Sequence, residues 1–492
     1  MPLDVLEFHR RTNHTYASVR RPGRGMDWQI KPWPFKDYVD RPFIRLPAPQ
    51  QAPPPEPTRL TLETLGHILY YCAGVTRVRE FDGKPFYFRA YACAGALYPV
   101  EVYVVAGDME GLEAGVYHFH AKEHVLRRLR AADKRGHLLA ATANDPTVAT
   151  APVTVVLSGI YWRTMWKYEA RGYRHLYWDS GMMLANLFAV AQVMGIPARL
   201  VLSFVDDQVD RLLGLDGRHE VSLALVPLGD AATVEPAPTE PPEINPEVRP
   251  LSSREIEYAD AMGAHDASRF RSTSEVGAFR TARCAHDMPL LAGDRIKLNP
   301  MKAPPDRIER VILRRGSTRR FSGDPVTFRQ LSTILAPALD PLCCDFHDPA
   351  AAINQLFLIV NAVDGLSSGA YCLDPRSREL ILIKTGAFRR DAGYLCLEQA
   401  LLAQAAAVIF LMADLVAATS ALGPRGYRAA QLEAGILSGQ LYLAAYALKL
   451  GASGSTFYDE AVTAFFAPAA GETSPMLAIG VGHDARRFRA DV

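Results

Sequence analysis

The sequence lacks the features that direct a chain to a membrane, to nucleic acid or to an oxidising compartment. Its 54 Lys and Arg residues are balanced by 53 Asp and Glu residues, so the net charge gives no sign of a nucleic-acid or anionic-membrane partner. The seven cysteines are an odd number without C-x-x-C spacing, which favours reduced thiols over disulfides or a metal site. The N-terminus has no apolar signal core. The longest uncharged run, residues 180–198, contains Asn186 and Gln192 and predicts a buried helix rather than a membrane span, so we expect a cytoplasmic protein.

Motifs of several common enzyme classes are also missing. The chain has no G-x-G-x-x-G fingerprint, no Walker loop, no zinc-ligand spacing and no G-x-S-x-G nucleophile elbow. These absences argue against a Rossmann dehydrogenase, a P-loop enzyme, a zinc enzyme and an α/β-hydrolase. With 49% hydrophobic residues, the 492-residue chain is long enough for two large domains or three smaller ones.

An internal repeat of domain size is the clearest positive feature. Gly172-Tyr173-Arg174 reappears as Gly426-Tyr427-Arg428, at an offset of 426 − 172 = 254 residues. The same offset relates Gly111-Leu112 to Gly365-Leu366, and an apolar helical run follows each Gly-Tyr-Arg. A period of this length indicates a duplicated domain and not a solenoid.

Composition divides the chain into four parts. Residues 1–58, rich in Arg, Pro and aromatic residues, predict an extended surface arm, and residues 231–304 begin with a Pro-rich linker. The two copies occupy residues 59–230 and 305–492. Their apolar runs predict strands at 100–106, 153–158 and 407–413, and helical spacing predicts helices at 61–74 and 327–335. We expect an α+β fold in each copy, with one sheet flanked by helices.

An Arg-rich stretch opens the second copy. Arg315, Ser317 and Arg319 alternate, as they would to grip a phosphate through charge-assisted hydrogen bonds. Taken alone, such a stretch is more often a solvated helix end. A weaker copy stands near the start of the chain, where Arg10, Thr12 and His14 alternate.

Two further stretches carry candidate site residues. Cys93, Ala94, Gly95 and Ala96 lead into a strand, and such small residues let a backbone approach a planar ligand closely, or simply form a tight packed turn. The pair Lys167-Tyr168 follows on a predicted helix. A lone Lys there is normally a solvated charge, but positions 421 and 422 are Ala and Leu, so the pair is not part of the repeated scaffold.

Taken together, these stretches resemble the nitroreductase-like flavoproteins and, within them, the SagB-type (thiazole/oxazole-forming) dehydrogenases. The matching segments are Arg315–Phe321, Ala94–Glu101, Trp166–Arg174, Leu212–Gly217 and Gly426–Gly435. The chain departs from the family pattern at Ala92-Cys93, where the family usually has Pro-Ser.

The resemblance implies an FMN protein in which each flavin lies across the interface of two α+β subunits. In this chain the duplication would form an intramolecular pseudo-dimer with one complete composite site. The second copy would supply Arg315, Ser317, Arg319, Glu433 and Gly435, with Gly454 and Ser455 as weaker candidates for the phosphate end, and the first copy would supply Cys93, Ala94, Gly95 and Ala96. We expect one FMN per chain, with the second site degenerate.

The resemblance also implies a catalytic role for Lys167 and Tyr168. In azoline-oxidising members a Lys-Tyr pair is associated with catalysis. Aromatising an azoline requires a base that takes a proton from carbon while hydride passes to the flavin, and either a Lys whose pKa is lowered by burial or the Tyr beside it could be that base. The leading hypothesis is a dehydrogenase or oxidase acting on a peptide-derived azoline or a similar natural-product intermediate, with biosynthetic partner enzymes. The alternatives are an NAD(P)H-dependent nitro- or quinone reductase and a flavin-binding scaffold protein without turnover. The arm would wrap the partner half or bind a leader peptide.

Overall fold

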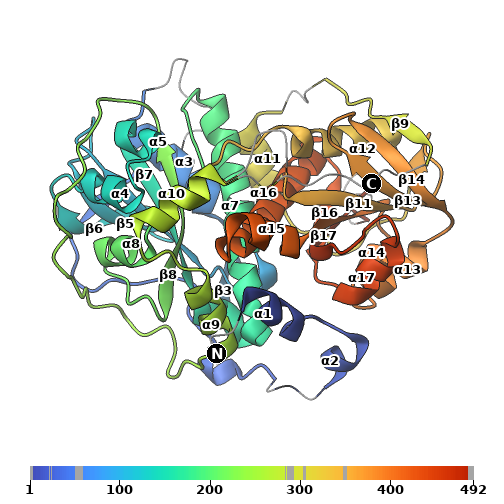
Figure 1. The fold of residues 1–492 in the computed structure, drawn as a ribbon, viewed down its shortest axis with the longest axis horizontal. Helices are drawn as coiled ribbons and strands as arrows, with labels where there is room; N and C mark the ends of the chain where they lie inside the picture. Colours follow the sequence, from blue (N-terminus) through green and yellow to red (C-terminus); the bar gives the residue numbers. More distant parts are fainter. Residues whose placement is uncertain are drawn as a thin grey trace.

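The chain folds into two halves that repeat the same order of helices and strands (Figure 1). The computed structural model describes residues 4–21, 23, 25–49, 59–282, 284, 293–302, 306–346 and 352–485. The Pro-rich end of the expected arm, residues 50–58, and residues 285–292 of the expected linker segment lie outside the described residues.

Each half contains one antiparallel sheet. In the described part of the first half the strand order is β1 (Phe43–Arg45), β6 (Val125–Ala131), β5 (Gly115–His120), β4 (Val100–Ala106), β7 (Val153–Ile160) and β8 (Glu220–Leu228). In the second half it is β9 (Arg295–Lys297), β14 (Glu379–Thr385), β13 (Gly369–Asp374), β11 (Asn354–Val360), β15 (Ala407–Ala413), β17 (Ser474–Gly482) and β16 (Gly451–Ser455). Among the described residues, the six strands of the first order correspond one to one to the first six of the second, and β16 is an additional edge strand. The α+β fold with one sheet per half is therefore confirmed.

Two small ladders and the helices complete the halves. Strands β2 (Val75–Phe81) and β3 (Lys84–Arg89) form a separate ribbon, and β10 (Val326–Thr327) pairs with β12 (Val363–Asp364). The first half has helices α3 (Leu62–Ala73), α4 (Arg135–Ala141), α5 (Pro146–Thr150), α6 (Tyr161–Tyr168), α7 (Gly172–Val193) and α8 (Asp206–Leu213). The second half has α11 (Ile308–Arg314), α12 (Phe328–Leu335), α13 (Arg389–Leu395), α14 (Ala400–Ala403), α15 (Leu415–Leu422), α16 (Arg425–Ala447) and α17 (Asp459–Phe466).

Helices α7 and α16 lie side by side at the centre of the molecule and join the halves (Figure 1). They approach closely because glycine faces glycine: a Cβ at Gly181 would lie 2.5 Å from the Cα of Gly435. One turn further along, a Cβ at Gly439 would lie 2.4 Å from the Cβ of Ala185. The repeated Gly after each Gly-Tyr-Arg thus allows the helices to cross, and each half becomes the other's packing partner.

Reciprocal buried ion pairs fasten this interface. Arg174 of α7 donates to Asp459 at the start of α17 in the second half, at 2.8 Å. Arg428 of α16, 254 residues later, donates to Asp206 at the start of α8 in the first half, at 2.7 Å. Each half therefore contributes one arginine and one acid, and the two ion pairs are equivalent, as they would be across the interface of a symmetric dimer.

The same two arginines show that the duplication begins earlier in the chain than expected. Arg174 also donates to Thr12 Oγ1, just after α1 (Val5–Arg11), and Arg428 donates to Ser268 Oγ, just after α9 (Ala259–Ala267). Helix α9 is therefore the counterpart of α1. The second repeat thus includes part of the segment expected to be a linker, and the expected arm is not extended throughout but begins with a helix.

This correspondence overturns one interpretation of the sequence. Arg10, Thr12 and His14 were expected to be a weaker copy of the Arg-Ser-Arg grip. Thr12 instead corresponds to Ser268, and His14 accepts a hydrogen bond from Asp459 N at 3.1 Å as Phe270 accepts one from Asp206 N. The side chain of Arg10 is bound to Glu7 at 2.8 Å. The interpretation was wrong because these three residues alternate in sequence as a phosphate grip does, but in the structure they bind other parts of the chain.

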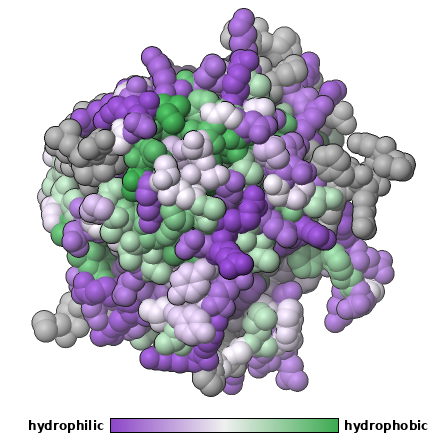
Figure 2. Space-filling model, turned by 90° about the vertical axis from the view of Figure 1, so that its right-hand side faces the viewer, coloured by the Kyte–Doolittle hydropathy of each residue, from purple (hydrophilic) through white to green (hydrophobic). Residues whose placement is uncertain are grey.

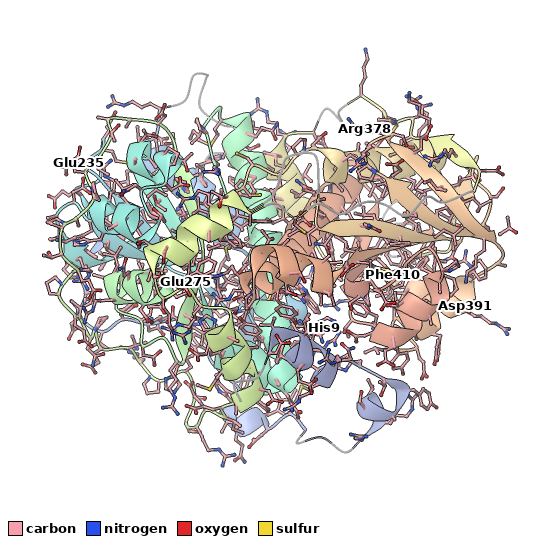
Figure 3. The ribbon with its side chains drawn as sticks, viewed as in Figure 1. His9, Glu235, Glu275, Arg378, Asp391 and Phe410 are labelled. Atoms are coloured by element: carbon pink, nitrogen blue, oxygen red, sulfur yellow. The ribbon has the colours of Figure 1, made fainter. Side chains whose placement is uncertain are left out.

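On the outer face of the second half, hydrophilic and hydrophobic residues intermingle (Figure 2). Glu235 and Asp391 lie at opposite edges of the molecule, whereas His9 on α1 lies between the halves (Figure 3). No helix within the described ranges is long and apolar enough to cross a membrane.

Candidate functional site

The turn of small residues before β4 is held by an acid from α7. Ala94–Ala96 form a single 3-10 turn, and both Gly95 (φ 63°) and Ala96 (φ 53°) have left-handed backbone conformations. Asp179 accepts hydrogen bonds from Ala94 N at 2.9 Å and from Cys93 Sγ at 3.0 Å. Because Gly tolerates the left-handed region without a steric cost, the turn can present its backbone outward while Asp179 fixes its base.

Burial raises the pKa of both groups at the base of this turn. Burial raises the pKa of Asp179 to about 7, although the Cys93 and Ala94 donors oppose the shift. Burial, together with the charge of Asp179, raises the pKa of Cys93 well above its ordinary value. Cys93, which stands where the resembling family has Ser, therefore acts here as a thiol donor to Asp179.

Lys167 and Tyr168 lie against this turn. A Cβ at Gly95 would be 3.1 Å from Tyr168 Oη and 3.4 Å from Lys167 Cδ. The pair ends α6, and the next residue, Glu169, has a φ of 50° that stops the helix. The structure thus brings together two predicted parts of the site, the small-residue turn and the Lys-Tyr pair.

The surroundings shift the proton affinities of this pair. Burial lowers the pKa of Lys167, and the charges of Arg319 and Lys31 lower it further. Burial raises the pKa of Tyr168, and the charges of Asp179 and Cys93 raise it further. A Lys with a lowered pKa is a better base near neutral pH than a solvated one, whereas the Tyr stays protonated.

Sequence reasoning missed a residue that positions Tyr168. The ring of His175 on α7 stacks on the Tyr168 ring, with centroids 4.1 Å apart and planes at 12°. Burial holds the pKa of His175 well below its ordinary value, so the stacked ring is neutral. Tyr168 and His175 are seven residues apart, which would place them on the same face of a continuous helix. The 3-10 turn Glu169–Arg171 interrupts the helix between them, so the spacing alone did not predict their contact.

The second half brings its Arg-rich stretch to the same side of the interface. Arg315 donates to the carbonyls of Ala90 (3.0 Å) and Arg89 (3.1 Å) in the first half and to that of Gly316 (3.1 Å). A guanidinium has five N–H groups, so two remain for a ligand. Arg315 therefore ties the halves together, and two of its N–H groups have no acceptor among the described residues.

Ser317 and Arg319 point outward from this stretch because the residue between them points inward. Thr318 is buried, and its N–H donates to Ala452 O of β16 at 2.9 Å, whereas Ser317 and Arg319 are exposed. In an extended segment, alternate side chains lie on the same face. The proximity of Arg319 to Lys167 is also visible in its effect on the pKa of Lys167.

Gly454 and Ser455, the weaker candidates, lie at the end of β16. Gly454 N donates to Tyr442 Oη, and Tyr442 also hydrogen-bonds Ser317. Ser455 Oγ accepts from Gln399 at 2.8 Å and donates to Thr456 O at 2.8 Å. Gly454 is thus linked to the Arg-Ser-Arg stretch, whereas the hydroxyl of Ser455 is already committed within the chain.

Glu433 and Gly435 are placed in the scaffold between the halves. The Glu433 carboxylate accepts from Asn354 N and Asn354 Nδ2, each at 2.7 Å. A Cβ at Gly435 would lie 2.6 Å from Trp178 O. The structure does not bring these two residues to the turn, and the acid that does contact it is Asp179, at the equivalent position of the first half.

The sequence of the first half offers no counterpart of the Arg-Ser-Arg stretch. Helices α3 and α12 correspond, since each begins with a Thr in a capping box, Thr61 and Thr327. The stretch at 315–319 lies 8 to 12 residues before Thr327 (327 − 319 = 8, 327 − 315 = 12). The corresponding region before Thr61, residues 47–57, contains no Arg and six Pro. The alternating Arg-Ser-Arg pattern therefore precedes the second of these two helices and not the first.

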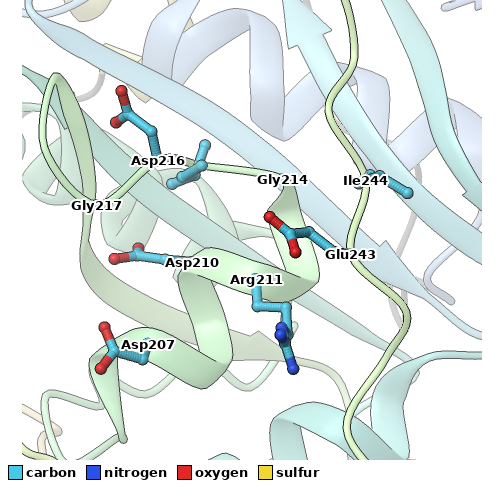
Figure 4. Close-up of a pocket in the computed structure, with 9 residues that line it drawn as sticks. Asp207, Asp210, Arg211, Gly214, Asp216, Gly217, Glu243 and Ile244 are labelled. Carbon is cyan, nitrogen blue, oxygen red and sulfur yellow. The ribbon is translucent and has the colours of Figure 1, made fainter.

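A cavity elsewhere in the first half is acidic and contains none of these residues. It has a volume of about 140 Å³ and is lined by Asp207, Asp210, Asp216, Glu243 and Arg211, together with neighbouring backbone (Figure 4). In the described part of the chain, no group of three or more His, Cys, Asp or Glu side chains is placed to hold a metal ion. We locate the candidate site by its donor groups and not by this cavity.

Comparison with known proteins gives a family and several relatives. The family described as "Nitroreductase family" matches residues 56–230 and 312–483. Over 170 residues the chain is 32% identical to a "Putative nitroreductase" of Methanocaldococcus jannaschii, covering 35% of this chain and 81% of that protein. A crystal structure of a "putative nitroreductase" from Anabaena variabilis superposes with a TM-score of 0.83 at 27% identity, over 98% of this chain and 100% of that chain.

Two further relatives are named as processing proteins. The chain is 30% identical over 168 residues to the trifolitoxin-processing protein TfxB of Rhizobium leguminosarum bv. trifolii, and 28% identical over 147 residues to the microcin B17-processing protein McbC of Escherichia coli. These matches cover 33% and 29% of this chain and 45% and 54% of the relatives. One family match in each half confirms the tandem duplication.

Proposed function

The chain belongs to the nitroreductase family, and from that premise we propose that it is an FMN-dependent dehydrogenase or oxidase acting on a peptide-derived azoline or a related heterocyclic intermediate. Family membership supports oxidoreductase chemistry. The finer proposal rests on one observation: Lys167 and Tyr168 lie against the small-residue turn of the first half, next to the cationic stretch of the second.

The residues of this region fit FMN. Arg315 with its two remaining N–H groups, Ser317 and Arg319 would hold the phosphate, since charge-assisted hydrogen bonds from arginine suit phosphate oxygens. The turn at Ala94–Ala96 would face the planar ring, because its small residues leave room for close approach. When bound, FMN would supply a two-electron acceptor, which no side chain provides.

The chain itself would handle the proton. Aromatising an azoline removes one hydride and one proton from the ring, and a double bond forms. Lys167, with its lowered pKa, would take the proton on Nζ, and Tyr168, held by His175, would orient the substrate through its hydroxyl. Burial of Tyr168 keeps its phenol protonated and therefore a donor.

A peptide-derived substrate is supported by similarity to two relatives, the trifolitoxin-processing and microcin B17-processing proteins. Biosynthetic partner enzymes that form the azoline from Cys, Ser or Thr residues belong to the same proposal, because an oxidase of this kind needs a cyclised substrate.

Replacement of Lys167 tests the proposal. We expect Lys167→Ala to keep bound flavin but to lower turnover of a synthetic thiazoline peptide by about 10²–10⁴-fold, the usual contribution of a general base. Loss of two hydrogen atoms from the peptide is followed by mass spectrometry. Lys297→Ala, at an exposed position on β9, is the matched control and should leave turnover unchanged. Undiminished turnover in Lys167→Ala would reject the base assignment.

A second candidate, an NAD(P)H-dependent nitro- or quinone reductase, is favoured by the match to the Methanocaldococcus protein, which covers 81% of that relative. Reduction of a quinone with NADPH distinguishes the two. Fast reduction of the quinone, combined with no turnover of thiazoline peptides, would favour the reductase.

A further inference from the structure

A segment of the N-terminal arm packs beside the Lys-Tyr pair. Trp166, which precedes Lys167, donates from Nε1 to Asp27 O at 2.8 Å. Its ring contacts that of Trp28 edge-on, with centroids 5.1 Å apart. Ile30 joins Trp166 in a small buried apolar cluster. The arm is thereby fixed next to α6, against the residue that precedes Lys167.

This segment presents a lysine among aromatic rings. Lys31 Nζ lies 5.2 Å from the ring centroid of Trp28 and 5.9 Å from those of Phe86 and Trp166. Phe86 belongs to the β2–β3 ribbon, so three separate segments surround the ammonium group. The rings attract the cation and hold it in place, yet they do not neutralise its charge. Trp28 itself is 64% exposed, which leaves much of its ring open to a ligand.

Three positive charges converge here without a carboxylate. Arg319 and Lys31 both lower the pKa of Lys167, after burial, and no acid acts in the opposite direction. Among the described residues, neither Lys31, Lys167 nor Arg319 forms an ion pair with an acid. Like charges destabilise one another, so such a group is favoured when an anion binds.

One anion does not account for all three charges. The phosphate of the proposed FMN would meet Arg319 with its neighbours Arg315 and Ser317 in the second half. Lys31 comes from a different segment, the arm of the first half, and lies against Trp166. The ammonium group of Lys31 could therefore bind a second anionic group beside Trp28.

We propose that the substrate is a heterocyclic carboxylate: Lys31 binds the carboxylate, and the exposed ring of Trp28 contacts the planar heterocycle. This inference rests on the proposed function for the identity of the ring, but the charge preference stands on Lys31 and its surroundings. It narrows the substrate class to azolines that carry a free carboxylate near the ring, such as a heterocycle at the C-terminus of a short peptide.

Equilibrium binding tests this proposal without turnover. The FMN-loaded protein is titrated with thiazole carboxylate and with the neutral thiazole carboxamide, and binding is followed by the change in flavin absorbance and by calorimetry. We expect the carboxylate to bind at least about tenfold more tightly, the usual gain from one charge-assisted hydrogen bond. Lys31→Met should abolish this preference while changing the affinity for the carboxamide less than about twofold.

Lys122→Met is the matched control, because Lys122 also lies over aromatic rings of the same half, 5.5 Å from Trp33 and 5.4 Å from Tyr87. It should keep the preference. Equal affinities for the two ligands in the unaltered protein, binding of neither, or equal loss in both Lys variants would overturn the proposal. Flavin content and thiazoline turnover are measured on the same preparation, so a protein that prefers the carboxylate but does not turn over would contradict only the proposed function.

Discussion

Removal of Asp206 should loosen the interface between the halves more than removal of any exposed acid. The Asp206 side chain is fully buried and accepts from Arg425 and, at 2.7 Å, from Arg428, which are buried as well. It also accepts from Phe270 N at 2.8 Å. In Asp206→Ala the two guanidinium groups would remain buried without a counter-charge.

The expected magnitude follows from this burial. Breaking a buried ion pair by removing one partner costs about 3–5 kcal/mol, and two stranded arginines place Asp206→Ala at the upper end of that range. Asp459→Ala, which strands Arg171 and Arg174, should have a similar effect, because its contacts mirror those of Asp206. Asp260→Ala removes an exposed 3.5 Å contact with Arg11 and should change stability by less than about 1 kcal/mol.

Urea unfolding followed by circular dichroism measures these differences, and its pH dependence adds a second check. Burial by itself would raise the pKa of Asp206, but Arg425 and Arg428 lower it to about 2. The stabilisation is therefore complete above the unfolded value of about 3.9 and is lost as the pH falls toward 2. An Asp206→Ala protein within about 1 kcal/mol of the unaltered one at pH 7 would refute the interpretation of the interface.

Three further predictions concern single positions. Gly181→Ala should destabilise by about 1–3 kcal/mol because its Cβ would lie 2.5 Å from Gly435, whereas Gly277→Ala in α10 (Thr273–Thr281), with nothing within 4 Å, should be neutral or stabilising; similar unfolding midpoints would contradict this. Lys31→Gln removes a positive charge that lowers the pKa of Lys167, so the acidic limb of the kcat/KM profile should move to higher pH, and an unmoved limb would count against Lys167 as the base. Burial raises the pKa of Asp179 to about 7, so the unaltered protein should lose stability relative to Asp179→Asn as the pH rises from about 4 to 7; a difference in unfolding free energy that is the same at pH 5 and pH 8 would reject this.

The sequence allowed the fold to be predicted wherever identity or apolar runs survive in both copies. Strands β4 and β15 were predicted with the bounds that the structure has, and Gly172-Tyr173-Arg174 revealed the duplication. Helix α14 spans only Ala400–Ala403, because Ala407 already begins β15 and the intervening alanines lead into it. Alanine-rich runs do not show where a helix must end.

The repeated N-terminal helices could not be recognised from sequence. Helices α1 and α9 share little identity, and their equivalence lies in backbone and hydroxyl acceptors, Thr12 Oγ1 and Ser268 Oγ, that different residues can supply. In the candidate site, the turn at Ala94–Ala96 and the Lys-Tyr pair were predicted separately, and their contact depends on how α6 meets the turn. The partners Asp179 and His175 come from α7 and needed the fold.

The number of flavins bound per chain tests the central claim most directly. The purified protein, incubated with FMN and freed of excess, is analysed for protein and released FMN. A ratio near one is expected, because the alternating Arg-Ser-Arg pattern stands in the second half and residues 47–57 of the first half contain no Arg. Arg315→Ala with Arg319→Ala should bring the ratio to zero, and Arg10→Ala should leave it at one. A ratio near two, or near zero in the unaltered protein, would contradict the account.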